Sequence, residues 1–141
     1  MPILKLWLVL LLSVSFLTVS LACGNSSGTF ARTGQSSTVA TISLQEALAS
    51  GKPTLAEFGS NSCIPCKQMK PILAELAILY KGKLNIVIIE VYEETKLTQQ
   101  YGIMAIPTQI VFDKNGKELG RHIGFWAKED IISTLKKIGV E

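Results

Sequence analysis

Runs of apolar residues interrupt the polar sequence at several places and predict β-strands. Residues 53–60 (PTLAEFGS) and 83–92 (KLNIVIIEVY) are nearly continuous runs, and the second is typical of a central strand covered on both faces. Residues 37–42 (STVATI) form a shorter run rich in β-formers. Residues 108–113 and 117–124 flank the tripeptide Lys-Asn-Gly, which is a hairpin signal.

Between these runs, apolar residues recur with helical spacing. In 63–81 they occupy positions 69, 72, 73, 76, 79 and 80, a stripe along one helix that Gly82 would end. Three shorter helices are predicted, at 44–50, 93–102 and 127–139. Strands and helices thus alternate before a hairpin and a last helix. We therefore expect one α/β domain over 38–141, with a central mixed β-sheet flanked by helices on both faces.

The first 22 residues follow a different pattern. Lys5 precedes an uncharged run from Leu6 to Ala22, which as a helix would reach about 25 Å, against about 30 Å for a hydrocarbon core. A charged start, an apolar middle and small residues at the end are typical of an export signal. We predict that 1–22 is an export signal peptide, with an uncleaved N-terminal anchor as the alternative, and that the rest of the chain works outside the cytoplasm.

Cys23 follows this run directly, in the sequence Ser-Leu-Ala-Cys. This sequence resembles the lipobox of bacterial lipoproteins, although Ser20 stands where leucine is usual. Exported proteins seldom leave a thiol unpaired, so we expect Cys23 to be lipidated and to anchor the chain on the extracytoplasmic side; an incidental cysteine is the alternative. Residues 24–37 are rich in Gly, Ser and Thr, so we interpret 23–37 as a lipidation site and flexible linker.

The composition of the chain excludes some classes of function. The formal net charge is +3, and 18% of the residues are charged, so no nucleic-acid partner is predicted. About a hundred residues can bury an adequate core without disulfide staples. The remaining two cysteines, Cys63 and Cys66, therefore call for a chemical explanation.

Three explanations for this pair can be compared. A zinc site needs four ligands, whereas the domain adds only His122, 56 residues after Cys66. Covalent haem needs histidine where this chain has Lys67. A structural bridge between residues three apart would remove little entropy from the unfolded chain. We expect no metal and no dissociable cofactor, with a metal clamp shared between two chains as the remaining alternative, and interpret the pair as a redox-active dithiol.

The position of the pair supports this interpretation. Residues 59–62 (GSNS) offer helix caps, which would place Cys63 in the first turn, where free N–H groups and the helix dipole favour a thiolate. Pro65 suits that turn, and Lys67 adds a positive charge. Cys66 follows on the same helix face. We therefore expect Cys63 to attack a substrate disulfide and Cys66 to resolve the mixed disulfide.

Four features occur together in the order found in thioredoxin: Cys-Ile-Pro-Cys-Lys at 63–67, Pro71, Ile-Pro-Thr at 106–108 and the Asn-Gly hairpin. Over 38–141 the chain resembles the thioredoxin family, which implies the thioredoxin fold and thiol–disulfide exchange. The resemblance implies that Pro107 is cis and presents the backbone of Ile106 to the substrate, although most X-Pro bonds are trans. It places five residues at the substrate surface: Ile64, Pro65, Ile106, Pro107 and Phe125.

Glu57 lies six residues before Cys63, where thioredoxins carry a buried aspartate that exchanges a proton with the inner cysteine. A carboxyl group buried in this strand would have the raised pKa that proton transfer needs. We therefore expect Glu57 to be catalytic; an acid that reaches solvent is the alternative.

The chain also departs from the family pattern. Ser62, Gly59 and Ile88 stand where a tryptophan, an aromatic residue and a lysine are usual, so the apolar docking rim is altered. Two pairs of interpretations stay open here. Phe125 and Trp126 either restore part of the rim or pack in the core, and Met104 either faces substrate or fills a gap. His122 is expected to have no catalytic part.

These interpretations give a functional hypothesis. The protein is expected to be a monomeric, extracytoplasmic thiol–disulfide oxidoreductase that reduces protein disulfides and receives electrons from a membrane thiol reductase. Proline before Cys66 resembles the reducing members of the family, whereas oxidases and isomerases usually carry histidine there. A disulfide oxidase or isomerase of the same fold is one alternative, and a non-catalytic binding module is the other.

Overall fold

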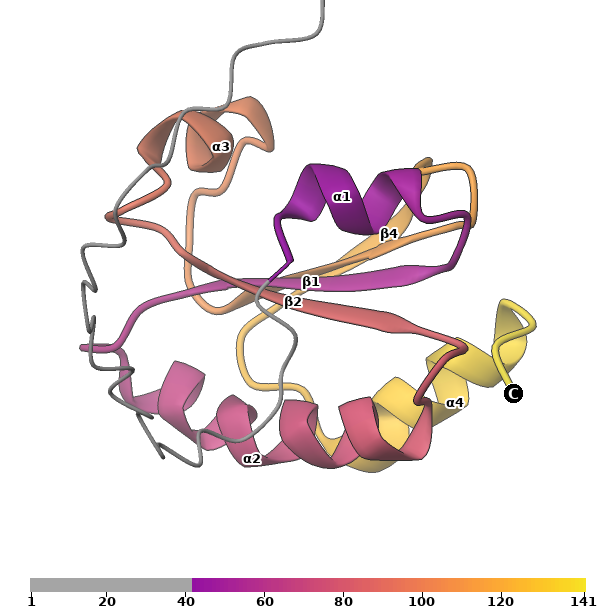
Figure 1. Cartoon of the computed structure of the whole chain (residues 1–141). Coiled ribbons are helices and arrows are strands. Elements are labelled where there is room, and N and C mark those ends of the chain that lie inside the picture. The colour runs from indigo at the N-terminus through magenta and orange to yellow at the C-terminus, as the bar shows by residue number, and fades with distance from the viewer. Residues whose placement is uncertain (1–41) are drawn as a thin grey trace, which may run out of the picture. The chain divides into compact units, whose positions relative to one another are not determined.

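A computed structural model describes residues 42–141, which form four strands and four helices (Figure 1). The strands are β1 Thr54–Gly59, β2 Asn85–Glu90, β3 Thr108–Phe112 and β4 Glu118–Ile123. They form one sheet in the order β2-β1-β3-β4. β1 and β2 are parallel, whereas β3 is antiparallel to both β1 and β4. The predicted mixed sheet is confirmed; of the predicted run 37–42, all but Ile42 lies outside the described residues.

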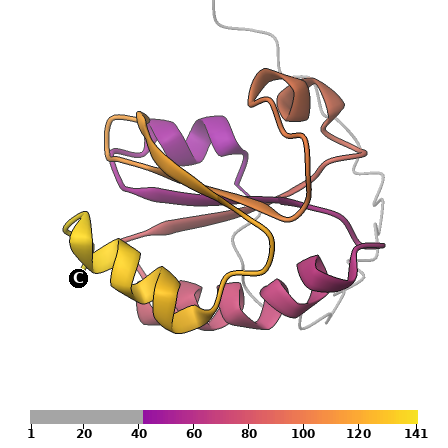
Figure 2. The same ribbon diagram turned by 180° about the vertical axis from the view of Figure 1, so that it is seen from behind.

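The helices are α1 Leu44–Ala49, α2 Ile64–Leu79, α3 Thr95–Gln100 and α4 Lys128–Lys137. Figure 1 shows α1 and α3 on one face of the sheet and α2 and α4 on the other, and the reverse view in Figure 2 agrees. The expected arrangement, with helices on both faces, is therefore confirmed. The α2/α4 face is the one that carries the cysteine pair, because α2 begins directly after Cys63.

Side chains of the strands alternate between two apolar clusters, as the pleat requires. Leu55 and Val111 belong to the cluster under α2 and α4, together with Met69 and Leu73 of α2. The opposite cluster, beside α1 and α3, contains Ala56, Phe58, Val87, Ile89, Ile110 and Phe112. The alternation matters for the site, because it fixes which strand residues can face α2.

The sequence predicts a central strand at β2, covered on both faces. In the sheet formed by the described residues, β2 lies at one edge, beside β1 alone. Both of its faces are nevertheless covered: Ile86 packs in the α2/α4 cluster and Val87 in the α1/α3 cluster. A continuous apolar run reports burial on two faces, and it does not report the number of neighbouring strands.

Local signals fix the ends of several elements. Ser43 and Glu46 form a reciprocal capping box at α1: Glu46 N–H donates to Ser43 Oγ at 3.2 Å, and Ser43 N–H donates to Glu46 Oε2 at 2.8 Å. The β3–β4 hairpin turns at Gly116, whose φ of 76° favours glycine. By contrast, α3 buries none of its side chains and has no side-chain cap.

No helix within residues 42–141 combines the length and the apolar character needed to span a bilayer. The segments predicted as export signal (1–22) and as lipidation site and linker (23–37), Cys23 included, lie outside the described residues.

Candidate active site

Cys63 is the N-cap of α2, the residue just before the first helical turn. Its Sγ accepts a hydrogen bond from the backbone N–H of Cys66 at 3.2 Å, and so occupies one of the free donors of the helix N-terminus. The expectation that Cys63 lies inside the first turn was therefore wrong by one position. The physical reason for that expectation is confirmed, because a free backbone N–H group of the helix N-terminus points at the sulfur. Pro65 lies in the first turn, where its missing N–H is not needed.

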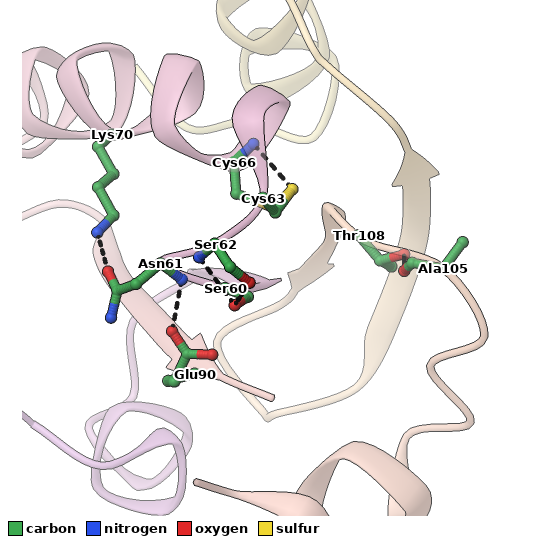
Figure 3. The surroundings of a disulfide bond; sticks show 9 residues. All are labelled: Ser60, Asn61, Ser62, Cys63, Cys66, Lys70, Glu90, Ala105 and Thr108. Atoms are coloured by element: carbon green, nitrogen blue, oxygen red, sulfur yellow. Dashed lines mark hydrogen bonds between the residues drawn. A yellow bond between two sulfur atoms is a disulfide. The ribbon is translucent and has the colours of Figure 1, made fainter. Parts of the chain in front are cut away.

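Residues 60–62 do not cap the helix, contrary to expectation, because they form the turn that leads into it. The Cys63 N–H donates to the Ser60 carbonyl oxygen at 3.2 Å, and the Ser62 N–H donates to Ser60 Oγ at the same distance. The Asn61 N–H donates to Glu90 Oε2 at 2.7 Å, and Lys70 Nζ donates to Asn61 Oδ1 (Figure 3). The loop before the cysteines is thus attached to β2 and α2.

The two cysteines form a disulfide with a Cα–Cα distance of 5.3 Å, and their surroundings differ. Cys66 is buried, with 2% of its surface exposed, whereas Cys63 is partly exposed. An incoming sulfur can therefore reach Cys63 and is blocked from Cys66 by the protein.

Glu57 of β1 is buried beneath this pair, with 1% of its surface exposed. Neither carboxyl oxygen has a hydrogen-bond partner among the described residues. Burial raises the pKa of Glu57 to about 7, while the positive charge of Lys70 acts in the opposite direction. The expected burial and raised pKa are confirmed, and the alternative of an acid that reaches solvent is excluded.

A cavity of about 160 Å³ joins Glu57 to the inner cysteine. Its wall includes Glu57, Cys66 and Gly59, and on the other side Lys70 and Glu90. A Cβ atom built on Gly59 would lie 3.3 Å from Cys66 Sγ and 3.5 Å from Glu57 Oε1. The absence of a side chain at Gly59 therefore leaves open the space between the carboxyl group and the sulfur.

The loop before β3 provides the opposite side of the site. The Ile106–Pro107 peptide bond is cis, as the family resemblance implied. Thr108 Oγ1 donates to the Ala105 carbonyl oxygen at 2.7 Å, and Gly124 N–H donates to the Pro107 carbonyl oxygen at 2.8 Å. Figure 3 shows Ala105 and Thr108 on the side of the cysteine pair where Cys63 lies.

The apolar residues that follow Cys63 and those near the cis-proline and after β4 differ in exposure. Ile64 is 71% exposed, Met104 94% and Phe125 47%, while Ile106 and Pro65 are half-buried and Pro107 is buried. The exposure of Met104 excludes the gap-filling interpretation.

Trp126, in contrast, belongs to the core. Its ring stacks on His122 with centroids 4.8 Å apart, and its backbone N–H donates to Met69 Sδ at 3.3 Å. The core interpretation therefore holds for Trp126, whereas Phe125 remains at the surface.

Three polar residues near the pair were not identified from the sequence. Lys70 follows Cys66 by four residues on α2, a spacing that places both on one helix side. Glu90 ends β2 and binds the Asn61 loop. Gln109 is fully buried in β3, and its position two residues before Val111 in an alternating strand was the available signal. Within residues 42–141, no three side chains of His, Cys, Asp or Glu gather to hold a metal ion.

An accessible sulfur on a helix N-terminus, joined to a buried sulfur beside a proton acceptor, can exchange disulfides with a second molecule. The fold and site thus define a thiol–disulfide oxidoreductase.

The thioredoxin family model matches residues 35–137. A thioredoxin from Alicyclobacillus acidocaldarius subsp. acidocaldarius is 35% identical over 101 residues, which cover 72% of this chain and 95% of that protein. One from Staphylococcus aureus (strain Mu50 / ATCC 700699) is 40% identical over 83 residues, 59% of this chain and 79% of that protein. The chain belongs to the thioredoxin family, and Cys63–Cys66 is its active-site disulfide.

Proposed function

We propose that this thioredoxin-family protein reduces disulfide bonds of proteins outside the cytoplasm. The observation that carries the proposed exchange chemistry is that Cys66 and the Glu57 carboxyl group line the same cavity. An isomerase must retain its mixed disulfide while the substrate rearranges. A base beside the resolving cysteine shortens the life of that intermediate, which argues against an isomerase. The reducing direction is inferred from Pro65 before Cys66, which resembles the reducing members of the family.

The reaction proceeds in two exchanges. The Cys63 thiolate attacks one sulfur of a substrate disulfide, and the other substrate sulfur leaves as a thiolate. The Cys66 thiol then gives its proton to the Glu57 carboxylate, and the Cys66 sulfur attacks Cys63 Sγ. The second substrate sulfur leaves and takes up a proton from water. Two electrons have then passed from the dithiol to the substrate, and the Cys63–Cys66 disulfide remains.

The substrate chain is held opposite the cysteines. In this proposal, the backbone of Ile106 beside Pro107 pairs with an extended substrate segment. Ile64, Pro65 and Phe125 contact its apolar side chains. The exposure of Ile64 and Phe125 supports this arrangement, because apolar groups left in water at a site opening gain free energy when a partner covers them.

Location and electron supply form a separate part of the proposal. The predicted export signal and the lipobox-like sequence at Cys23 support a protein that is anchored on the extracytoplasmic side of a membrane. A membrane thiol reductase then restores the dithiol, and the protein acts as a monomer. Mass spectrometry of the membrane fraction tests the anchor: a mature N-terminus other than diacylated Cys23 would reject it.

The direction is tested by equilibrating the full-length chain with defined thiol buffers. We expect a reduction potential of about −270 mV, the value for thioredoxin. A value of about −120 mV would indicate an oxidase. Insulin reduction, with Cys63→Ser as the control, tests catalysis itself. No activity in the unaltered chain would contradict the proposal and favour a binding module. Activity that survives in Cys63→Ser would reject Cys63 as the attacking residue.

A further inference from the structure

Gln109 is the one neighbour of Glu57 in the sheet that can form hydrogen bonds with its carboxyl group. The register of the antiparallel β1–β3 pair places Glu57 directly opposite Gln109. On the other side, Glu57 is paired with Ile88, which has no hydrogen-bonding side chain. Because opposed residues in an antiparallel pair project to the same face, Glu57 and Gln109 share the face covered by α2 and α4.

Both side chains are buried and lack partners. Gln109 is 0% exposed and Glu57 1%. In the oxidised structure, neither the amide of Gln109 nor the carboxyl group of Glu57 forms a hydrogen bond within residues 42–141. A buried amide without a partner costs free energy that an apolar side chain of the same size would not cost. The burial of a glutamine at position 109, instead of an apolar residue, therefore requires an explanation.

The neighbouring strand on the other side of β3, β4, does not provide a hydrogen-bond partner that would explain Gln109. Gln109 is paired with His122 of β4. His122 Nε2, however, lies 3.2 Å from the Phe125 carbonyl oxygen, and the ring stacks on Trp126. With Nε2 and one ring face of His122 engaged in this way, Glu57 is the neighbour in the sheet whose polar atoms are, like the amide, buried and without a partner within residues 42–141.

We propose that Gln109 is a positioning residue for Glu57: once the two side chains rotate from the unpartnered conformation described above, the amide hydrogen-bonds the carboxyl group across the β1–β3 pair in both protonation states. Opposed Cβ atoms in such a pair lie about 4.5–5.5 Å apart, within reach of two long side chains after a rotation of their terminal torsions. The amide N–H donates to the ionised carboxylate. Its oxygen accepts from the protonated carboxyl group. One side chain can thus satisfy Glu57 before and after it takes the proton of Cys66.

The charged groups around Glu57 set the background for this effect. From α2 this is Lys70, from β2 Glu90, and beyond Gln109 in β4 the titratable His122; Cys66 of α2 is held in the disulfide of the oxidised chain. Gln109 adds a neutral partner to this set. A hydrogen bond to a charged acceptor is stronger than one between neutral groups, so the amide favours the carboxylate more than the acid. Its removal must therefore raise the pKa of Glu57 above its present value.

The test is a carbon-13 NMR titration of the Glu57 carboxyl carbon in the full-length oxidised chain, with Glu57→Gln to assign the signal. In Gln109→Leu we expect the midpoint to move upward by about one pH unit. Gln109→Met, which keeps the side-chain length, should move it in the same direction and covers the case of a leucine variant that folds poorly. Val111→Ala is the matched control, because Val111 lies on the same strand and face and forms no hydrogen bond through its side chain.

A midpoint in Gln109→Leu and Gln109→Met that equals that of the unaltered chain, or lies below it, would overturn the proposal. The inference rests on the proposed role of Glu57, but the titration does not depend on activity. The rate of thiol release from a Cys63 mixed disulfide, followed against pH in the unaltered chain and in Glu57→Gln, tests that role separately. A shifted titration with a rate unaffected by Glu57→Gln would uphold the hydrogen bond and reject Glu57 as the base.

Discussion

The Sγ atom of Cys63 accepts the backbone N–H of Cys66 at 3.2 Å, so the exposed cysteine forms the N-cap of the helix that contains its partner. After reduction, the same N–H group can stabilise a thiolate on Cys63. Cys66, one turn inside the helix and buried, has no comparable access to a substrate. The two cysteines should therefore behave differently when each is replaced.

We expect Cys66→Ser to trap a covalent complex. Its Cys63 can still attack a substrate disulfide, but no second sulfur remains to release the product. A non-reducing gel with an oxidised protein substrate should show a band for the mixed disulfide, which disappears on addition of a reducing thiol. Cys63→Ser serves as the control and should give no such band. A complex trapped by Cys63→Ser instead would reverse the assigned roles.

The raised pKa of Glu57 predicts a pH dependence of stability. The folded chain retains the Glu57 proton up to about pH 7, whereas an unfolded chain releases it near its ordinary value of 4.5. The stabilising contribution is therefore complete below pH 4.5 and is lost as pH rises through about 7, a change of about 3 kcal/mol. Urea unfolding of the oxidised chain between pH 4 and 9 measures it.

Glu57→Gln is the control for this titration, because it cannot ionise. We expect its stability to lack the decline between pH 4.5 and 7, and to exceed that of the unaltered chain at pH 8. If both proteins follow the same pH curve, Glu57 is not the group that titrates.

Lys70 should influence Glu57 through its charge. Its positive charge lowers the pKa of Glu57, so Lys70→Gln should raise it further. Lys70 is exposed at the surface, and the effect should shrink in 1 M salt, where the screening length is only about 3 Å. Lys67→Gln offers a comparison on the same helix. An equal shift in both variants would point to a general charge effect instead of the cavity geometry.

Gly59 should tolerate alanine poorly. The added Cβ would lie 3.2 Å from Cys66 Cβ and 3.3 Å from its Sγ, closer than comfortable packing allows. We expect Gly59→Ala to lower the free energy of unfolding of the oxidised chain by about 1–3 kcal/mol. Gly120→Ala in β4 is the matched control, since nothing lies within 4 Å of its added atom. Equal stability of the two variants would show that the space beside Cys66 adapts freely.

Much of the fold was predictable, because each local signal has one simple physical meaning. The helical stripe in 63–81 located α2, and the Lys-Asn-Gly tripeptide located the β3–β4 hairpin. The position of β2 at one edge of the sheet formed by residues 42–141 was not predictable in this way. Its apolar residues reflect the helices packed on its two faces, whereas its neighbours in the sheet depend on how distant segments pair.

The cysteine pair was predictable from chemistry and spacing, whereas the buried carboxyl group of Glu57 was expected from the family resemblance and from its place in an apolar strand. Lys70, Glu90 and Gln109 were missed because none belongs to a short motif. Their proximity arises from strand register and from the approach of α2 to the sheet. Trp126 shows the reverse case, since its place beside the exposed Phe125 gave no sign of which of the two would turn inward.

Helices α2 and α3, which flank the cysteine pair and the cis-proline loop in sequence, differ in how many side chains they bury. On one side, α2 buries Cys66, Met69, Leu73 and Leu76. On the other, α3 buries no side chain, has no side-chain cap, and leads into the loop that carries Met104 and the cis-proline. Elements with so few buried contacts open locally at little cost in free energy. The cysteine pair thus begins a well-packed helix, whereas the loop with the cis-proline follows a helix that buries no side chain, so we expect that loop to open locally more readily than the start of α2.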